Sequence, residues 1–295
     1  MFRRWPGRER AIRCQRLSCL IRLHMSQHGP SRPKLIVSVL SWNAPRYLAN
    51  LLDNLAHAPP SLTMPFNVVV LDQGNAEDAR SVLRQRESVY SQWLTSLYSD
   101  VNHGFSGGHN VVFDHVWQRS RFDYFVVVNQ DVLFNKAGWC DDLVTATKIQ
   151  PNVAISGPVA HAINYERCVF ERRRPDELSG GQAFIEASIA LMRTDVVCKA
   201  GLFDEEFHPA YYEDADLCCR YRALGWNMGI TPVAHVHQYL GTDKHSASRK
   251  KLEADHPDWV STNRDLFFGR WSSPAPLTAG DVRSVFPKVY FPRSP

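Results

Sequence analysis

The sequence predicts an α/β protein whose central sheet is mostly parallel and covered by helices on both faces. Short apolar runs of strand length alternate with helix-like stretches; LIVSVLSW at 35–42, VVVL at 68–71 and YFVVV at 124–128 are such runs. Strands buried on both faces read as continuous apolar runs, whereas half-exposed strands alternate apolar and polar residues. Each run also ends in hydrogen-bonding side chains, as expected where ligands bind beyond the carboxyl ends of parallel strands.

The N-terminal half repeats a unit of strand, turn and helix. The strand at 35–42 closes at Asn43-Ala44-Pro45, and the helix predicted at 47–57 carries leucines on one face at positions 48, 51, 52 and 55. The next units are a strand at 68–71 with a helix over 76–90, a strand at 94–98 with a helix over 110–119, and the strand at 124–128.

The C-terminal half is less regular. VAISGP at 153–158 predicts a further strand, and the Arg-rich segment 161–181 predicts an exposed excursion because it has few apolar residues. Residues 183–192 return to a core-like composition, and 228–236 are strand-like. Between them, 211–226 predicts a helix with an apolar stripe of Leu217, Tyr221 and Leu224, which Gly225 would end.

Composition and charge exclude some functions. The 295 residues, 44% apolar and 22% charged, can bury a sizeable core. The formal charge of +4 comes from the first 24 residues, which hold seven Arg against Glu9, whereas the remainder has 27 basic and 29 acidic residues. The body therefore lacks the basic surface of a nucleic-acid-binding protein.

The first 33 residues predict a disordered basic leader. They lack the apolar core of a secretory signal, and no stretch of the chain reaches the ~18 apolar residues of a membrane span. A transit peptide and an over-extended start before Met25 are the two interpretations of the leader. Seven cysteines without a CxxC pair predict reduced thiols in a cytoplasmic protein and argue against structural zinc.

Three carboxylates, Glu213, Asp214 and Asp216, crowd into the first turn of the helix predicted over 211–226. Acids there complement the positive end of the helix dipole, and Asp214 could cap backbone N–H groups. The catalytic interpretation is that one of them is a general base whose pKa is shifted by its neighbours.

Polar groups follow four consecutive strands: Ser41 with Asn43, Asp72, the loop NHGFSGGHN at 102–110, and Asp131. Turn chemistry explains each cluster alone, whereas a binding crevice explains why they recur at the carboxyl ends of strands.

The loop at 102–110 matches neither the Walker A motif nor GxGxxG. Its residues 104–108, GFSGG, formally match the G-x-S-x-G nucleophile elbow, with Asp214 and His237 downstream. A serine esterase of the α/β-hydrolase type that uses Ser106 is therefore an alternative function.

Several segments, in this order and spacing, resemble glycosyltransferase family 2, particularly its rhamnosyltransferase-like branch. They are SVLSWN, VVVLDQGN, NHGFSGGHN, VVVNQDVLF, GLFDEEFHPAYYEDADLCCRYRALGW and HQYLGT, and FDEEFHPAYYEDADLCCR is the most specific part. The resemblance implies a GT-A, Rossmann-like domain over 34–271, with a nucleotide-sugar-binding half at 34–135 and an acceptor and catalytic half at 136–271, followed by a tail at 272–295. It also implies inverting transfer from a nucleotide-diphosphate sugar to an acceptor hydroxyl.

The resemblance assigns roles to individual residues. Asp214 matches the catalytic base of the family's ED motif, with Glu213 and Asp216 in support. Nucleotide-binding positions of the family fall on Ser41, Asn43, Asp72, Asn102, Gly104, Phe105 and Asn129.

A divalent cation, Mg²⁺ or Mn²⁺, is also implied. Asp131 matches the last acid of the DxD motif, and His237 matches a histidine that can complete the metal site; His235 would share its face of a strand and is the fallback. The first acid is replaced by Asn129, so the motif reads NQD. A neutral ligand holds a hard cation more weakly, so we expect the metal to bind chiefly with the donor diphosphate.

The implied partners are a dTDP- or UDP-sugar donor and a glycan or lipid-linked acceptor, in cell-surface polysaccharide or glycolipid synthesis. Peripheral contact with the inner face of the membrane is one use of the C-terminal aromatics, and packing against the body is the other; they are Trp259, Phe267, Phe268 and Trp271. Non-catalytic nucleotide-sugar binding, nucleotidyl transfer and nucleic-acid binding by the leader are the remaining alternatives.

Overall fold

The computed structural model describes residues 35–293 apart from residue 76 and the segments 173–182, 239–251 and 274–276. The leader predicted at 1–33 and part of the excursion predicted at 161–181 lie outside the described residues.

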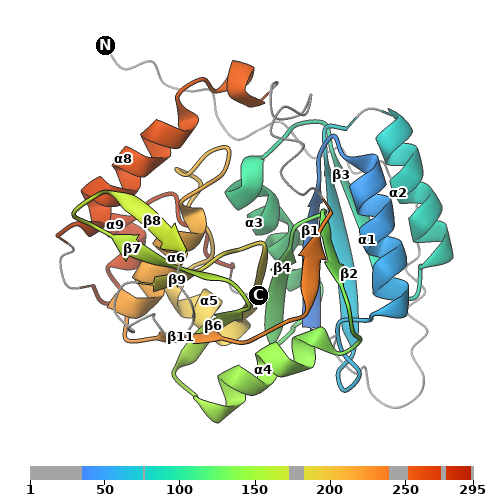
Figure 1. The fold of residues 1–295 in the computed structure, drawn as a ribbon, viewed down its shortest axis with the longest axis horizontal. Coiled ribbons are helices and arrows are strands. Elements are labelled where there is room, and N and C mark those ends of the chain that lie inside the picture. The colour runs from blue at the N-terminus through green and yellow to red at the C-terminus, as the bar shows by residue number, and fades with distance from the viewer. Residues whose placement is uncertain (1–34, 76, 173–182, 239–251, 274–276, 294–295) are drawn as a thin grey trace. The chain divides into compact units, whose positions relative to one another are not determined.

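A seven-stranded sheet has the order β11-β6-β10-β4-β1-β2-β3 (Figure 1). Only β10 runs antiparallel to its described neighbours, β4 and β6, and the other pairs in this sheet are parallel. The prediction of a mostly parallel sheet is therefore confirmed. Its strands are β1 (Leu35–Ser41), β2 (Phe66–Gln73), β3 (Leu94–Ser99), β4 (Tyr124–Val128), β6 (Val153–Gly157), β10 (Ile189–Arg193) and β11 (Asn227–Ile230).

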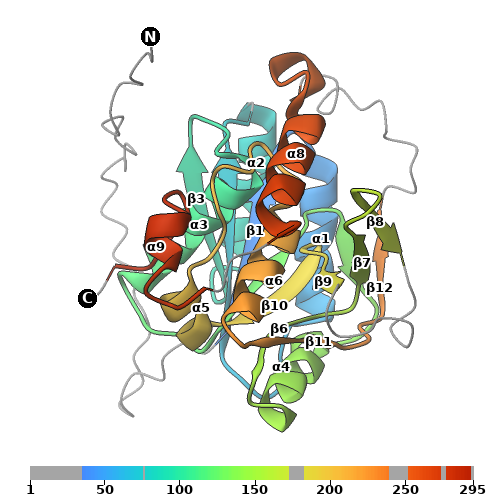
Figure 2. The same cartoon turned by 90° about the vertical axis from the view of Figure 1, so that its left-hand side faces the viewer.

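Helices cover both faces of this sheet (Figures 1 and 2). One apolar cluster joins the sheet to α1 (Pro45–His57), α2 (Glu77–Val89) and α4 (Trp139–Ile149). The other cluster joins it to α3 (Gly104–Trp117), α5 (Thr194–Ala200), α6 (Glu213–Ala223) and α8 (Trp259–Trp271). The apolar runs of the sequence are thus buried from both sides.

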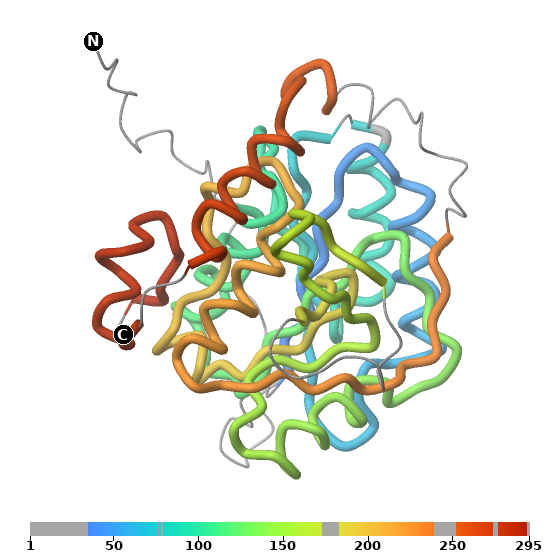
Figure 3. The backbone as a smooth tube through the Cα atoms, turned by 60° about the vertical axis from the view of Figure 1, so that its left-hand side comes forward, coloured from blue at the N-terminus to red at the C-terminus, as the bar shows by residue number. Residues whose placement is uncertain are grey.

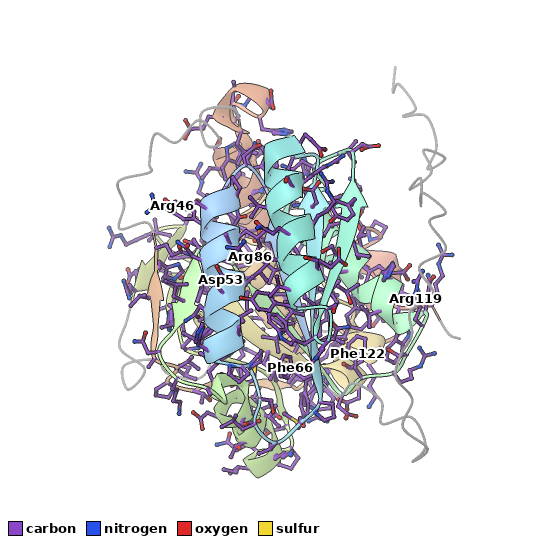
Figure 4. All side chains as sticks on the ribbon, turned by 90° about the vertical axis from the view of Figure 1, so that its right-hand side faces the viewer. Arg46, Asp53, Phe66, Arg86, Arg119 and Phe122 are labelled. Carbon is purple, nitrogen blue, oxygen red and sulfur yellow. The ribbon has the colours of Figure 1, made fainter. Side chains whose placement is uncertain are left out.

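Ion pairing supports the outer layer on the α1 and α2 side. Arg86 of α2 lies beside Asp53 of α1 (Figure 4). The two side chains are 2.7 Å apart, and the Tyr90 hydroxyl donates to the same carboxylate at 2.9 Å. The hydrogen bond from Arg86 is the main reason why the pKa of Asp53 lies below its ordinary value.

Two small sheets flank the central one. β5 (Val132–Phe134) pairs antiparallel with β12 (His235–His237), so the orange segment near 235 returns along the green segment near 133 (Figure 3). The second small sheet has the order β8-β7-β9, with β7 at Ala160–Asn164, β8 at Val169–Arg172 and β9 at Ala183–Ile185.

The C-terminal aromatics pack into the body. Trp259, Phe267, Phe268 and Trp271 are 7%, 0%, 5% and 4% exposed, so none of these side chains offers a surface to a membrane. The tail continues this packing, because the short helix α9 (Val282–Val285) leads to Phe286, whose ring stacks on Trp271. No helix in the described part of the chain is long and apolar enough to cross a bilayer. The five cysteines in this part of the chain are free thiols.

The glycine-rich stretch after β3 differs from the prediction. The sequence predicts a loop followed by a helix from 110, but α3 already begins at Gly104. A Cβ atom on Gly108 would lie 2.7 Å from Gln73 Oε1 and 2.9 Å from Leu40. The glycine therefore lets the first turns of α3 approach the carboxyl ends of β1 and β2, although glycine is a poor helix former.

We expect Gly108→Ala to lower the free energy of unfolding by about 1–3 kcal/mol, because the added methyl group overpacks this contact. Gly269→Ala in α8 is the matched control. A Cβ atom there meets nothing within 4 Å, so the better helix propensity of alanine should stabilise the protein by up to about 1 kcal/mol. Urea denaturation measures both changes. Equal stability of the two variants would contradict the packing argument.

Candidate active site

The NQD motif lies at the carboxyl end of β4, beside β12. Pairing of β12 with β5 places His237 opposite Val132, and His237 Nδ1 lies 3.2 Å from Asp131 Oδ2. The hydrogen bond with Asp131 raises the pKa of His237 above its ordinary value, although burial opposes this. The structure thus brings together two residues that are 106 positions apart in the sequence. His235 instead contacts the Val233 carbonyl oxygen through Nδ1 at 2.7 Å.

Asp131 and His237 could contribute two ligands to a metal ion. Within the described residues, no group of three or more His, Cys, Asp or Glu side chains is arranged to hold a metal. Mg²⁺ usually binds through one or two carboxylates together with substrate phosphates and water. The donor set therefore fits a cation that arrives with, or is completed by, a diphosphate.

The acidic first turn of α6 follows a strained backbone. Tyr211 and Tyr212 have φ angles of +73° and +75°, a region that costs free energy for residues other than glycine. From α8, Asn263 Nδ2 lies 3.4, 2.9 and 3.3 Å from the carbonyl oxygens of His208, Ala210 and Tyr211. Asn263 thus holds the loop that leads into the helix.

Asp214 is partly buried at the start of α6. Its Oδ1 accepts the N–H of Ala215 at 2.8 Å, and its Oδ2 accepts the N–H of Ala187 at 3.3 Å. Burial raises the pKa of Asp214 to about 6, the two backbone N–H groups oppose the shift, and the charge of Glu186 adds to it. A carboxylate with a raised pKa that is still ionised at neutral pH suits a general base.

Residues 186–188 connect Asp214 to the NQD motif. The N–H of Ala187 donates to Asp214, and the carbonyl oxygen of the next residue, Ser188, accepts the N–H of Asn129 at 3.0 Å. This contact continues the pairing of β10 with β4, in which Ile189 faces Val128. Adjacent residues of one segment therefore contact both acidic motifs, although more than eighty positions separate Asn129 from Asp214 in the sequence.

The other two acids of the cluster have different environments. Glu213 is buried, and its Oε2 has no hydrogen-bond partner among the described residues. Burial, followed by the charge of Asp214, raises the pKa of Glu213 well above its ordinary value. Asp216 is fully buried and accepts hydrogen bonds from Arg220 (2.8 Å), Arg270 (2.7 Å) and Trp271 (2.9 Å). Asp216 thus connects α6 to α8.

A pocket of about 180 Å³ opens at the carboxyl ends of β1, β2 and β3. Asn102 lines it, as the family resemblance implies for a nucleotide-binding residue. The sequence patterns did not single out its other lining residues, which are Trp42, Gln73, Gly74, Asp100, His208, Pro209, Leu252, Asp255 and His256.

Ser41 and Asp72 lie beneath the surface. They are 1% and 0% exposed, and Asn75 Nδ2 donates to both side chains, at 3.1 and 2.6 Å. Arg80 also donates to Asp72, at 3.0 Å. The backbone N–H of the exposed Asn43 donates to Asn75 Oδ1 at 2.5 Å. Asn75 thus connects the ends of β1 and β2. In the sequence, the only indication of this role is that Asn75 follows the apolar strand predicted at 68–71.

Gly104 and Phe105 pack against the loop at 208–209. The Phe105 N–H donates to the Pro209 carbonyl oxygen at 2.7 Å, and a Cβ atom on Gly104 would lie 2.6 Å from the same oxygen. Asn102 supports this turn, because its Oδ1 accepts the N–H of Gly104 at 2.8 Å.

Ser106 does not have the setting of a hydrolase nucleophile. It lies inside α3, is 1% exposed, and its hydroxyl donates to the carbonyl oxygen of Phe207 at 3.4 Å rather than to an imidazole. An activated serine needs a base within hydrogen-bond reach and access to substrate. The geometry therefore does not support the esterase alternative.

Comparisons with known proteins identify the class. The fold is that of the GT-A glycosyltransferases. The model of the family described as glycosyltransferase-like family 2 matches residues 33–262, so the chain belongs to this family. A comparison with curated proteins finds no match.

Two solved structures are similar to the chain at low sequence identity. A mannosyltransferase, PcManGT from Pyrobaculum calidifontis, in complex with GDP-Man and Mn²⁺, aligns with a TM-score of 0.54 and 16% identity over 86% of this chain and 75% of its own. GalNAc-T7 with UDP, GalNAc and Mn²⁺ aligns with a TM-score of 0.54 and 12% identity over 87% of this chain and 54% of its own. At these identities the likeness shows the fold.

We expect Asp216→Ala to destabilise the protein by about 3–5 kcal/mol, because it removes a buried carboxylate from Arg220 and Arg270. Asp265→Ala is the control, since its side chain is 70% exposed. Urea denaturation measures both variants. An Asp216→Ala variant with unchanged stability and lost turnover would assign Asp216 to the chemistry instead.

Proposed function

We propose that the protein is an inverting glycosyltransferase that moves a sugar from a nucleotide-diphosphate sugar to an acceptor hydroxyl. The observation that carries the proposal is the segment 186–188, which contacts Asp214 at one residue and Asn129 of the NQD motif at the next. A general base and a diphosphate site that are held by adjacent residues of one segment could act on the same sugar carbon.

Asp214 is the base in this proposal. It removes the proton of the acceptor hydroxyl as that oxygen attacks the anomeric carbon, and the bond from this carbon to the diphosphate oxygen breaks on the opposite face. The configuration at the carbon is therefore inverted. The N–H groups of Ala187 and Ala215 fix the orientation of the carboxylate, so that it meets the hydroxyl without reorganisation.

The leaving group would lie at the other end of the segment. Asp131 and His237 would hold Mg²⁺ or Mn²⁺ together with the diphosphate, with Asn129 beside them. When bound, the cation neutralises charge on the departing diphosphate. The two similar structures are complexes that contain Mn²⁺ and a nucleotide or nucleotide sugar, which supports such a donor here.

The pocket at the ends of β1 to β3 would hold the nucleoside, since ligands of parallel sheets bind at this edge. Ser41, Asp72, Asn43, Gly104 and Phe105 would then shape the pocket from behind, and Asn102 would contact the nucleoside directly. This assignment divides the chain into a donor half at 34–135 and an acceptor and catalytic half at 136–271.

The family resemblance also supports finer roles that belong to the proposal. They are a dTDP- or UDP-sugar donor, a rhamnosyltransferase-like activity, a glycan or lipid-linked acceptor, and a place in cell-surface polysaccharide or glycolipid synthesis in the cytoplasm.

Asp214→Asn should lower kcat by about 10²–10⁴-fold, the usual effect of deleting a general base, while nucleotide-sugar binding is retained. Release of nucleoside diphosphate from UDP-, dTDP- and GDP-sugars measures turnover, and calorimetric titration measures binding. Asp265→Asn is the control with the same chemical change on an exposed side chain. Release of pyrophosphate in place of nucleoside diphosphate would indicate nucleotidyl transfer, and an unchanged kcat would remove Asp214 from its role.

The same base predicts a pH dependence. Asp214 must be ionised to accept a proton, and its pKa is raised to about 6, so kcat/KM should rise with pH through about 6 and then level off. Measurement of kcat/KM from pH 4.5 to 8.5 tests this. The residual activity of Asp214→Asn should lack this acidic limb; a limb that persists in the variant belongs to another group.

A further inference from the structure

Glu186 is an acidic side chain in the site that none of the roles above uses. It precedes Ala187, which contacts Asp214, and Ser188, which contacts Asn129. Ala187 and Ser188 are 5% and 4% exposed, whereas the side chain of Glu186 is 35% exposed. Of these three residues, Glu186 is therefore the one whose side chain can meet a ligand.

His161 fixes the Glu186 carboxylate. Its Nε2 lies 2.7 Å from Glu186 Oε2, and its ring stacks on Phe184 with 5.4 Å between centroids. Burial disfavours ionisation of Glu186, but the hydrogen bond from His161, the Ser188 hydroxyl and the charges of His161 and His237 together hold the pKa of Glu186 below its ordinary value. A carboxylate accepts several hydrogen bonds, so this group stays available to a donor beyond His161.

The position of Glu186 indicates that its ligand is the sugar that is transferred. In the proposed reaction the anomeric carbon lies between the attacking oxygen at Asp214 and the leaving diphosphate at Asp131. The segment 186–188 contacts Asp214 and the NQD motif, so a donor sugar bound between these groups would lie beside it. The charge of Glu186 contributes to the raised pKa of both Asp214 and His237, as expected for a carboxylate near both.

We propose that Glu186, oriented by His161, accepts a hydrogen bond from a hydroxyl group of the donor sugar and so selects donors that carry a free hydroxyl at that place. The proposal rests on the proposed function. Glu186 is the specificity residue and touches substrate, whereas His161 is a positioning residue that acts through it.

Binding measurements test this role independently of turnover. A panel of UDP-glucose, GDP-mannose and dTDP-rhamnose identifies a nucleotide-sugar that binds, and its Kd is compared with that of the matching free nucleoside diphosphate. Glu186→Ala should weaken binding of the nucleotide-sugar about 10-fold, the effect of one lost hydrogen bond to a charged group. Binding of the nucleoside diphosphate should not change, because it has no sugar ring at this place.

Two further variants separate a sugar contact from a structural effect. His161→Ala should weaken nucleotide-sugar binding, and His161→Gln should restore much of it because glutamine also donates a hydrogen bond. Glu166→Gln removes a charge from an exposed carboxylate between β7 and β8 and should change neither affinity. Correct folding of each variant is checked by its thermal unfolding temperature.

The outcomes distinguish the inference from the function on which it rests. Glu186→Ala that binds the nucleotide-sugar as tightly as the unaltered protein overturns the inference, and so does an equal loss for nucleotide-sugar and nucleoside diphosphate. If the unaltered protein binds no nucleotide-sugar of the panel, with or without Mn²⁺, the proposed function fails and the inference with it.

Discussion

The backbone of Ala187 and Ser188 is the constraint on which the site depends. β10 is the strand that runs antiparallel between β4 and β6, so its start, not its end, meets the carboxyl end of β4. This reversal brings the residues that precede β10 to the edge where ligands of parallel sheets bind. The backbone N–H of Ala187 then faces Asp214, and the carbonyl oxygen of Ser188 accepts the N–H of Asn129.

The three acids in the first turn of α6 have different roles because their surroundings differ. Asp216 points into a buried network in which Arg220 and Arg270 satisfy both of its oxygens. Glu213 is buried and pairs with no cation in the described part of the chain, so its neutral form is favoured. Asp214 retains partial exposure and two backbone donors, which leaves it ionised near neutral pH. The same three-residue pattern thus supplies an anchor, a neutral acid and an accessible carboxylate.

Periodicity and apolar runs predicted the sheet, its mostly parallel sense and the start of α6, because these follow from local burial. The pairing of Asp131 with His237 came only from family resemblance, since no local pattern shows that the residue before β5 meets the end of β12. The early start of α3 was missed because Gly107 and Gly108 look like loop residues. The close approach of Gln73 and Leu40 explains why a glycine occupies position 108 of this helix. Sequence spacing could not identify the roles of Asn75, Glu186 and His161. Glu186 and His161 contact each other across 25 positions. Asn75 contacts Ser41 across 34 positions, and only its contact with Asp72 is local.

The contacts of Asn263 limit which segments of this protein can be exchanged with those of a homologue. The helix α8 contributes no group to the proposed chemistry, yet its Asn263 holds the backbone of the loop that enters α6, and its Arg270 and Trp271 bind Asp216. A chimera that exchanges the segment around the acidic turn with a homologue must therefore import α8 from the same parent. A crossover between the acidic turn and α8 would separate these partners.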